Sequence, residues 1–490
     1  MDSPAASVRL RSATGRAVVL ATVLGSALAM LDATVVNIAL PRIGEDLGAS
    51  VAGLQWVLSG YTLTLASLIL LAGALGDRLG RRKVFVWGTV WFAVASALCG
   101  LAPSIELLVA ARVLQGVGAA LLTPGSLALL SATIDPDDRG EAIGLWSGLG
   151  GVASAAGPLL GGWIVEVASW RAVFWLNLPL AAAVVWVAAR HVPESRDPHP
   201  QGRLDLPGAT LAALALASLT YGLIAGLWLA VVAGAGLLVA FVVVEVRSDN
   251  PLVPPSLFRS RVFTAANLVT LAVYAALGGV FFLLVLQLQL AVGFSPLAAG
   301  LATLPITVLM LLLSARAGRF AQHHGPRLPM TAGPLIAALG LVLMLRIGPG
   351  SSYLRDVLPG VIVFGLGLSA LVAPLTGAVL ASVSTDRAGI ASGVNNAVAR
   401  SSQLLAVAAL PGLVGIAGTN YTDPQVFSHG FHVAMLICAA LLVIGAAIAA
   451  VMIPAARPAA EPRDSIECQP HCDISAPALV PDDESSLEDR

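Results

Sequence analysis

Two charged residues inside long apolar stretches are the first candidates for chemistry in this sequence. Asp32 lies in an apolar segment at 17–40, and Arg112 lies between the charge-free segments 84–105 and 113–134. A carboxylate at the centre of a membrane-spanning helix costs about 2.5–3.5 kcal/mol to insert. Burial favours its neutral form, so such a group could take up and release a proton. The alternative is that Asp32 lies near the membrane surface and only caps its helix.

Arg112 belongs to a helical segment that combines polar and small residues. Arg112, Gln115 and Gly116 share one helix face, because residues three and four apart are neighbours on a helix. The small residues Gly116, Ala119 and Ala120 let another helix approach closely. Arg112 could stabilise a nearby carboxylate or hold a chain of water molecules. The alternative is a purely structural ion pair.

Six polar side chains within apolar segments are candidates for the wall of a substrate cavity. Each amide among them could equally form a hydrogen bond between helices. Arg400 is the only charged residue between Ala388 and Thr422, so it should face protein or water rather than lipid. It could bind an anionic group of a substrate or pair with Asp32. The candidates are Asn37, Tyr274, Gln287, Asn395, Asn396 and Arg400.

The composition indicates a polytopic membrane protein. Hydrophobic residues make up 57% of the 490 residues and charged residues only 11%, against about 25% charged residues in a typical soluble domain. Polar side chains are too few to cover several water-exposed domains, and the four cysteines do not suggest a disulfide framework. A net charge of −1 gives no attraction to nucleic acid. Cys468, His471 and Cys472 in the polar tail are only a weak signal for a metal site.

Apolar segments predict fourteen transmembrane helices and an all-α fold. A helix needs about 20 residues to cross the hydrocarbon core. The stretch at 206–244 is too long for one crossing and should fold back near Gly222–Trp228, and the stretch at 262–315 should break at Gly293–Pro296. The other predicted spans lie near 17–40, 47–76, 84–105, 113–134, 142–165, 172–189, 328–346, 357–380, 388–416 and 431–453.

Basic residues are distributed unevenly between the two sets of loops, which predicts the orientation in the membrane. Arg42, Arg171, Arg346 and Arg355 are the basic residues of one set, whereas most of the 27 lysines and arginines fall in the other set and in both ends of the chain. Cytoplasmic loops carry an excess of Lys and Arg. We therefore expect a multi-pass protein of the cell inner membrane with both termini in the cytoplasm.

A weak internal repeat predicts two related halves. The segments 73–82 and 318–327 both carry two glycines separated by six residues, and both end in an arginine. Two similar halves with a substrate site between them are a transporter architecture. The predicted organisation is a cytoplasmic N-terminus at 1–16, a six-helix domain at 17–190, two inserted helices at 206–247, a six-helix domain at 262–453 and a disordered acidic cytoplasmic tail at 454–490.

Two further segments suggest parts that pack closely or move. Gly157 and Gly161 lie four residues apart on one helix face, where small residues let a second helix approach, and Pro158 can kink this helix. After the second span, Asp77 is expected to contact a helix N-terminus near 385–389, where a carboxylate is stabilised by the helix dipole. The alternative is that the basic cluster of this loop only sets the topology.

Four motifs resemble those of the major facilitator superfamily and, within it, the fourteen-helix drug:proton antiporter family. In chain order they are Leu31-Asp32-x-Thr34-Val35-Val36-Asn37-x-Ala39-Leu40-Pro41, Gly73-x-Leu75-x-Asp77-Arg78-x-Gly80-Arg81-Arg82, Arg112-x-x-Gln115-Gly116-x-Gly118-Ala119-Ala120 and Gly157-Pro158-x-x-Gly161-Gly162. The resemblance covers about residues 15–455. The sequence departs from the family pattern at Ala153, which replaces a glycine, and at Gln322, which replaces an acidic residue.

The resemblance implies a proton-coupled antiporter that exports amphipathic drugs or antibiotics by alternating access. It assigns proton coupling to Asp32 and Arg112, and conformational gating to Gly73, Asp77, Arg78, Gly80, Arg81, Gly157, Pro158 and Gly161. No GxxxxGK[ST] pattern occurs in the sequence, so the expected driving force is the proton gradient, without a cofactor or metal, in a monomeric protein. A dedicated exporter of one metabolite, amino acid or lipid stays open, as does a membrane sensor or assembly partner. An enzyme is not expected.

Overall fold

The chain folds almost entirely into helices. The computed structural model describes residues 8–196, 205–248, 251–384, 387–416, 418 and 420–455, and within these residues it contains no β-strand. The predicted acidic tail beyond residue 455, including Cys468, His471 and Cys472, lies outside the described residues, and so do residues 1–7 of the predicted N-terminus.

Fifteen α-helices form the described part of the chain, with a few single-turn elements between them. The first half contains α1 (Ala13–Leu47), α2 (Val51–Leu79), α3 (Arg81–Leu101), α4 (Ile105–Thr133), α5 (Pro136–Val167), α6 (Trp170–Trp175) and α7 (Asn177–His191). The inserted pair is α8 (Leu206–Ala225) and α9 (Trp228–Arg247). The second half contains α10 (Arg261–Leu286), α11 (Pro296–His324), α12 (Arg327–Leu343), α13 (Leu358–Ala381), α14 (Ala388–Leu413) and α15 (Pro424–Met452).

The number of spans agrees with the fourteen that the sequence predicts. Thirteen helical segments of the described residues are long and apolar enough to cross a membrane, with α6 and α7 counted as one segment. The remaining helix, α14, has 26 residues, and its Asn395, Asn396 and Arg400 make it more polar than the others. The inserted pair reverses direction as predicted, because α8 ends at Ala225 and Gly226 adopts a left-handed φ of 68°.

The helices extend beyond the charge-free segments from which the spans are predicted. The first span, predicted at 17–40, is part of a helix that begins at Ala13 and ends at Leu47. Ser12 caps its start by accepting a hydrogen bond from the backbone N–H of Gly15, and Gly48 ends it with a φ of 60°. Charged residues are tolerated in these outer turns because they lie near water rather than in the hydrocarbon core.

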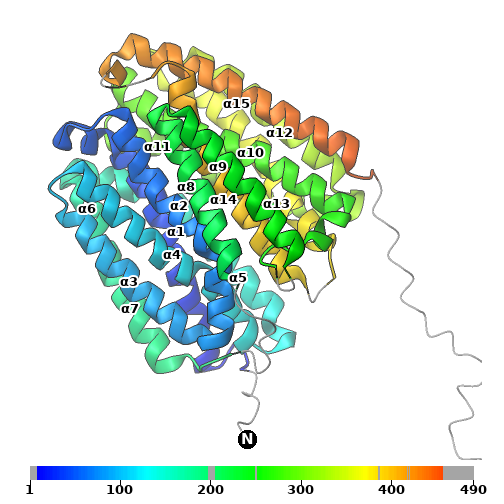
Figure 1. Cartoon of the computed structure of the whole chain (residues 1–490). Coiled ribbons are helices and arrows are strands. Elements are labelled where there is room, and N and C mark those ends of the chain that lie inside the picture. The colour runs from blue at the N-terminus through cyan, green and yellow to red at the C-terminus, as the bar shows by residue number, and fades with distance from the viewer. Residues whose placement is uncertain are drawn as a thin grey trace, which may run out of the picture.

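The two halves pack side by side, and the inserted pair lies across the line where they meet. Within the first half, α1 packs against α5, and α4 packs against α2 and α3. Across the halves, α5 packs against α11, and α2 packs against α14. Helix α8 contacts both α2 and α14. Figure 1 shows the first half in blue and cyan, with the inserted helices α8 and α9 in green.

The two ends of the helix bundle differ in how the halves are joined. We call the end with the loops at Gly80 and Gly325 the arginine-rich end, and the end with the loops at Gly48 and Gly226 the arginine-poor end. One hydrophobic core includes Ile43 and Leu54 of the first half together with much of the second half, so it joins the halves toward the arginine-poor end. A second core, toward the arginine-rich end, consists of buried residues of the first half.

Candidate functional site

Asp32 is the centre of a buried polar network in the first half. Its side chain is fully buried and accepts three hydrogen bonds from side chains of other helices. Arg112 Nη1 donates to Oδ2 at 2.5 Å, while Gln115 Nε2 and Asn177 Nδ2 both donate to Oδ1 at 2.9 Å. The predicted alternative of a surface position is wrong, because Asp32 is buried among α1, α4 and α7.

Arg112 is held as tightly as its partner. Its Nη1 also donates to Gln115 Oε1 at 2.6 Å, and its Nε donates to the backbone carbonyl of Val57 on α2 at 3.1 Å. The guanidinium lies over the ring of Tyr61, 4.3 Å from the ring centroid, which is a favourable cation–π geometry. Its Nη2 is buried without a hydrogen-bond partner among the described residues. Arg112 therefore keeps one buried N–H group, at Nη2, that could donate a further hydrogen bond.

A further layer of polar residues, absent from the sequence-based prediction, holds this network in place. Asn177 Nδ2 also donates to Ser96 Oγ at 3.0 Å, and Ser96 Oγ donates to the carbonyl of Phe174 at 2.9 Å. Cys99 contacts Gln115 Oε1 through its sulfur at 3.5 Å. Asn177 is the one amide in the apolar segment 172–189, which is the signal that could have identified it.

In the conformation that the structure describes, Asp32 and Arg112 form an ion pair that two amide donors support. Hydrogen bonds between charged groups are stronger than those between neutral groups. Protonation of Asp32 would leave Arg112 as a buried charge without a counter-ion, which is costly. A proton can therefore bind favourably only if Arg112 finds another partner, so protonation and rearrangement of this network are linked.

Arg400 does not pair with Asp32, although the sequence left that pairing open. It lies on α14, which packs against α2 with Tyr61 and against α10 with Tyr274. It has no ion-pair partner within the described part of the chain. The charge of Arg400 acts on both tyrosines, and we take Tyr61, Tyr274 and Arg400 together as the candidate polar site between the halves.

The other predicted cavity residues occupy different environments. Asn37 Nδ2 donates to the carbonyl of Phe281 in the second half at 2.8 Å, so it joins the halves. Gln287 is buried within the second half, where it donates to the carbonyl of Ile347 and to Ser428 Oγ. Asn395 donates to Asn267 and Thr270 of α10. Asn396 is exposed and donates to the carbonyl of Ser392 in its own helix.

Hydrogen bonds between the halves gather at the arginine-poor end. Gln55 Nε2 donates to the carbonyls of Val407 at 2.7 Å and Ala408 at 3.0 Å. Tyr421 donates through its hydroxyl group to the carbonyl of Ala49 at 2.9 Å. Further bonds connect Gln289 with Ile38, and Ser295 and the backbone of Leu297 with Glu166. The structure is therefore closed at the arginine-poor end.

The predicted gating loop is held mainly by residues of the first half. Asp77 forms an ion pair with Arg81 at 2.8 Å, one turn away. Arg78 lies in the last turn of α2, near Gly73 and the loop. Gly80 has a φ of 110° and lies against the carboxylate of Glu194, where a side chain would not fit. Asp77 was predicted to contact a helix start near 385–389, and residues 385 and 386 of that segment lie outside the described residues.

The small residues of α5 let it pack between α1 and α11. A side chain at Gly157 would collide with Thr34, and one at Gly161 would lie 2.8 Å from Val35. On the opposite side, Gly300 of α11 lies against the backbone carbonyl of Pro158. These contacts link Asp32-bearing α1 to the second half through one closely packed helix.

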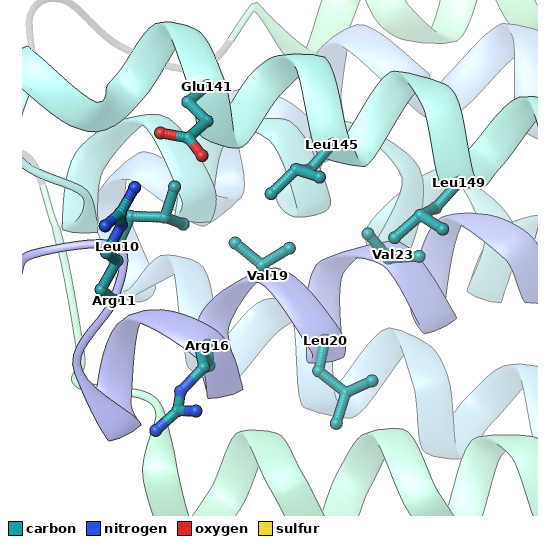
Figure 2. Close-up of a pocket in the computed structure, with 9 residues that line it drawn as sticks. All are labelled: Leu10, Arg11, Arg16, Val19, Leu20, Val23, Glu141, Leu145 and Leu149. Atoms are coloured by element: carbon teal, nitrogen blue, oxygen red, sulfur yellow. The ribbon is translucent and has the colours of Figure 1, made fainter.

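A cavity of about 490 Å³ lies between the arginine-rich ends of α1 and α5. Its wall is mostly apolar, and Arg11, Arg16 and Glu141 provide its charges. Figure 2 shows these charged residues at one end of the cavity and Val23 and Leu149 at the other. Asp32 is further along α1 and does not line this cavity, so the cavity and the buried network are separate features.

Comparison with known proteins identifies the family. Residues 22–407 match the family described as the Major Facilitator Superfamily. The chain belongs to this superfamily. It is therefore a multi-pass membrane transporter and not an enzyme, in agreement with the prediction.

Relatives with curated names include several resistance and export proteins. The chain is 36% identical over 392 residues to the multidrug resistance protein Stp of Mycobacterium tuberculosis, covering 77% of this chain and 72% of the relative. It is 35% identical to the puromycin resistance protein pur8 of Streptomyces alboniger, covering 93% of this chain and 94% of that protein. It is 35% identical to the cephamycin export protein CmcT of Amycolatopsis lactamdurans, covering 86% and 90%.

Solved structures confirm the transporter fold. A peptide transporter POT in complex with sulfate matches with a TM-score of 0.68 and 15% identity over 92% of this chain and 98% of that chain. A bacterial homologue of the human lysosomal transporter Spinster, in an inward-facing and unoccupied conformation, matches with a TM-score of 0.63 and 18% identity, covering 90% and 97%. Identities at this level support the fold alone.

Proposed function

We propose that the chain exports an amphipathic organic compound, of the kind that includes antibiotics, in exchange for protons. The relatives named for resistance to, or export of, such compounds support export as the direction of transport. The proposed setting is a bacterial inner membrane, with both termini in the cytoplasm and one chain acting alone. The gradient would supply about 2.3 kcal/mol per charge for each 100 mV of membrane potential.

The buried Asp32–Arg112 pair is the observation that carries this proposal. Asp32 pairs with Arg112 and accepts three side-chain hydrogen bonds in a conformation that is closed at the arginine-poor end. In the proposed cycle, opening of that end admits a proton to Asp32 and releases Arg112. Return to the described conformation restores the ion pair and expels the proton. Coupling then follows from the cost of leaving either charge buried alone.

Tyr61 provides the proposed route from the proton site to the substrate. Its ring packs on Arg112, and its helix α2 packs against α14, which carries Arg400. A displacement of Arg112 would therefore move Tyr61 and change the site that Tyr61, Tyr274 and Arg400 form between the halves. We place the polar part of the substrate there. With the arginine-rich end in the cytoplasm, the described conformation would load substrate from the cytoplasm.

A narrow substrate range is the second candidate. Two relatives with high coverage are named for single compounds, puromycin and cephamycin, whereas Stp is named for multidrug resistance. A dedicated exporter of one metabolite would use the same coupling site. Drug susceptibility of cells with and without the protein, over several antibiotic classes, separates these two possibilities.

Proton release by reconstituted protein tests the coupling role of Asp32. Asp32→Asn should abolish uphill, proton-driven transport but leave downhill exchange of substrate, and Asp32→Glu should retain part of the coupling with a changed pH profile. Asp46→Asn is the matched control, because Asp46 lies on the same helix and pairs with Arg171 near the surface at 2.6 Å. Uphill transport by the Asp32→Asn protein would show that Asp32 is only structural.

A further inference from the structure

A second pair of acidic residues lies far from Asp32, at the base of the inserted helices. Asp205 precedes the first turn of α8, and Glu245 lies in the last turn of α9. Asp205 is 9% exposed and Glu245 is 4% exposed. Carboxylates are rarely buried to this extent unless they are paired with a cation or share a proton. The transport mechanism proposed above does not use either residue.

Each carboxylate has one oxygen bound to the backbone and one oxygen without a donor. Asp205 Oδ1 accepts a hydrogen bond from the backbone N–H of Gly208 at 2.8 Å, and Glu245 Oε2 accepts one from Val253 at 2.9 Å. Asp205 Oδ2 and Glu245 Oε1 are buried and have no hydrogen-bond partner among the described residues. A buried acceptor without a donor is costly.

The two unsatisfied oxygens point to the same place. A Cβ atom at Gly208 would lie 2.5 Å from Glu245 Oε1 and 2.7 Å from Asp205 Oδ2, so both oxygens lie beside the space that this glycine leaves open. The negative charge of Asp205 acts on the Glu245 carboxyl group. The linker before α10 donates backbone hydrogen bonds to the same group from Leu252 and Val253. Two carboxylates in one site repel each other when both are ionised, and a single proton between them converts the repulsion into a hydrogen bond.

A proton fits this site better than a metal ion. Calcium takes about six to eight oxygen ligands and magnesium requires octahedral geometry. Only two carboxylate oxygens are available here, and the described residues contain no group of three or more His, Cys, Asp or Glu side chains that could hold a metal. One proton satisfies both oxygens without any further ligand.

We propose that Asp205 and Glu245 form a proton-binding site that holds one shared proton and fastens the α8–α9 pair to the linker that precedes α10. The hydrogen bond from Val253 ties the end of α9 to this linker, and α8 contacts both α2 and α14. Loss of the proton brings two buried negative charges together and loosens the attachment. The inserted pair thereby carries a pH-sensitive junction next to helices of both halves.

Thermal unfolding across pH tests the site without any transport measurement. A proton held in the folded state stabilises the protein at low pH, and this stabilisation is lost as the pH rises. The melting temperature of the parent protein should therefore drop by several degrees more than that of Glu245→Gln between mildly acidic and mildly alkaline pH. The amide of Glu245→Gln can donate a hydrogen bond to Asp205 at any pH, so this variant does not need the shared proton. Asp423→Asn, at the exposed cap of α15, is the control for a cap substitution.

Infrared spectroscopy provides the direct readout. The parent protein should show a protonated carboxyl band that disappears on alkaline titration, and the band should be missing in both Asp205→Asn and Glu245→Gln. Gly208→Ala should also remove it by separating the oxygens, whereas Gly236→Ala, with nothing within 4 Å, should not. The proposal is overturned if the band is the same in parent and Glu245→Gln proteins. It is also overturned if sodium or calcium ions stabilise the parent but not the Glu245→Gln protein.

Discussion

Asp32 and Arg112 are both completely buried, and each is the counter-ion of the other. Substitution of one residue leaves the other charge buried and unpaired, which costs about 3–5 kcal/mol. An amide at position 32 is cheaper to bury than a carboxylate, but this gain does not offset the cost. The relevant cost arises at Arg112, whose remaining partners, Gln115 and the carbonyl of Val57, carry no charge.

A double-mutant cycle measures this dependence. Asp32→Asn and Arg112→Gln should each lower the free energy of unfolding in detergent by about 3–5 kcal/mol, and the double variant should lose less than the sum. A coupling of about 0.5–3 kcal/mol is typical of residues in one network. Strictly additive losses would contradict the view that the two charges depend on each other.

The sequence predicts the members of this site better than their contacts. Asp32, Arg112 and Gln115 stand out as polar residues in apolar or small-residue helices, and the spacing of Arg112 and Gln115 places them on one helix face. Their meeting with Asp32 depends on how α1 and α4 pack, and these residues are 80 positions apart in the chain. For the same reason the sequence could not decide between Arg112 and Arg400 as the partner of Asp32.

At the level of helices, α5 is the element that connects α1, which carries Asp32, with the second half. Gly161 lies against Val35 of α1, and Gly162 lies against the backbone of Pro296 and Leu297 in the first turn of α11. The sequence predicts close packing for this helix from its small residues. The sequence does not predict which helices pack there, because a row of glycines indicates only that another helix approaches closely.

Gly161→Leu should disrupt this packing. The new side chain would overlap the backbone and side chain of Val35, and overpacking of this kind costs about 1–3 kcal/mol. We expect a lower melting temperature and slower transport. Gly148→Leu is the matched control on the same helix, because a Cβ atom at Gly148 meets nothing within 4 Å. Equal effects of the two substitutions would mean that the α1–α5 contact is not critical.

Helix lengths show where sequence patterns are accurate and where they are not. The turn between α8 and α9 is predicted correctly because Gly226 ends α8 with a left-handed conformation. The span predicted at 17–40 begins later than α1, because the charge-free segment marks the hydrocarbon core, whereas Ser12, which accepts a hydrogen bond from Gly15, marks the start of the helix. The distribution of charged residues thus indicates the boundary of the hydrocarbon core, whereas the capping residue indicates the end of the helix.

For the whole molecule, the orientation in the membrane follows from the arginine distribution and can be tested in intact cells. In a cysteine-free background, a single cysteine at Leu227, which is 47% exposed in the turn between α8 and α9, should react with an impermeant reagent from outside. A cysteine at Arg11 should react only after the cells are opened. Reaction at Arg11 in intact cells would reverse the proposed orientation and the assignment of the cytoplasmic end.

The closed state of the arginine-poor end depends on hydrogen bonds between the halves, and Gln55 contributes two of them. Gln55→Leu removes the bonds to Val407 and Ala408, a loss of about 1–2 kcal/mol that favours the open form about 5- to 30-fold. Gln287→Leu is the matched control, because that buried glutamine donates only within the second half, to Ile347 and Ser428.

Spin labels on the exposed residues Glu45 and Gln425 report the separation of the halves at this end. We expect one short distance in the parent protein, an added longer distance in Gln55→Leu, and the parent distribution in Gln287→Leu even if that protein is less stable. The distinction matters because both substitutions bury a similar side chain, and only one removes a contact that must break when the arginine-poor end opens. If both variants populate the longer distance equally, general destabilisation rather than the contact between the halves controls the opening.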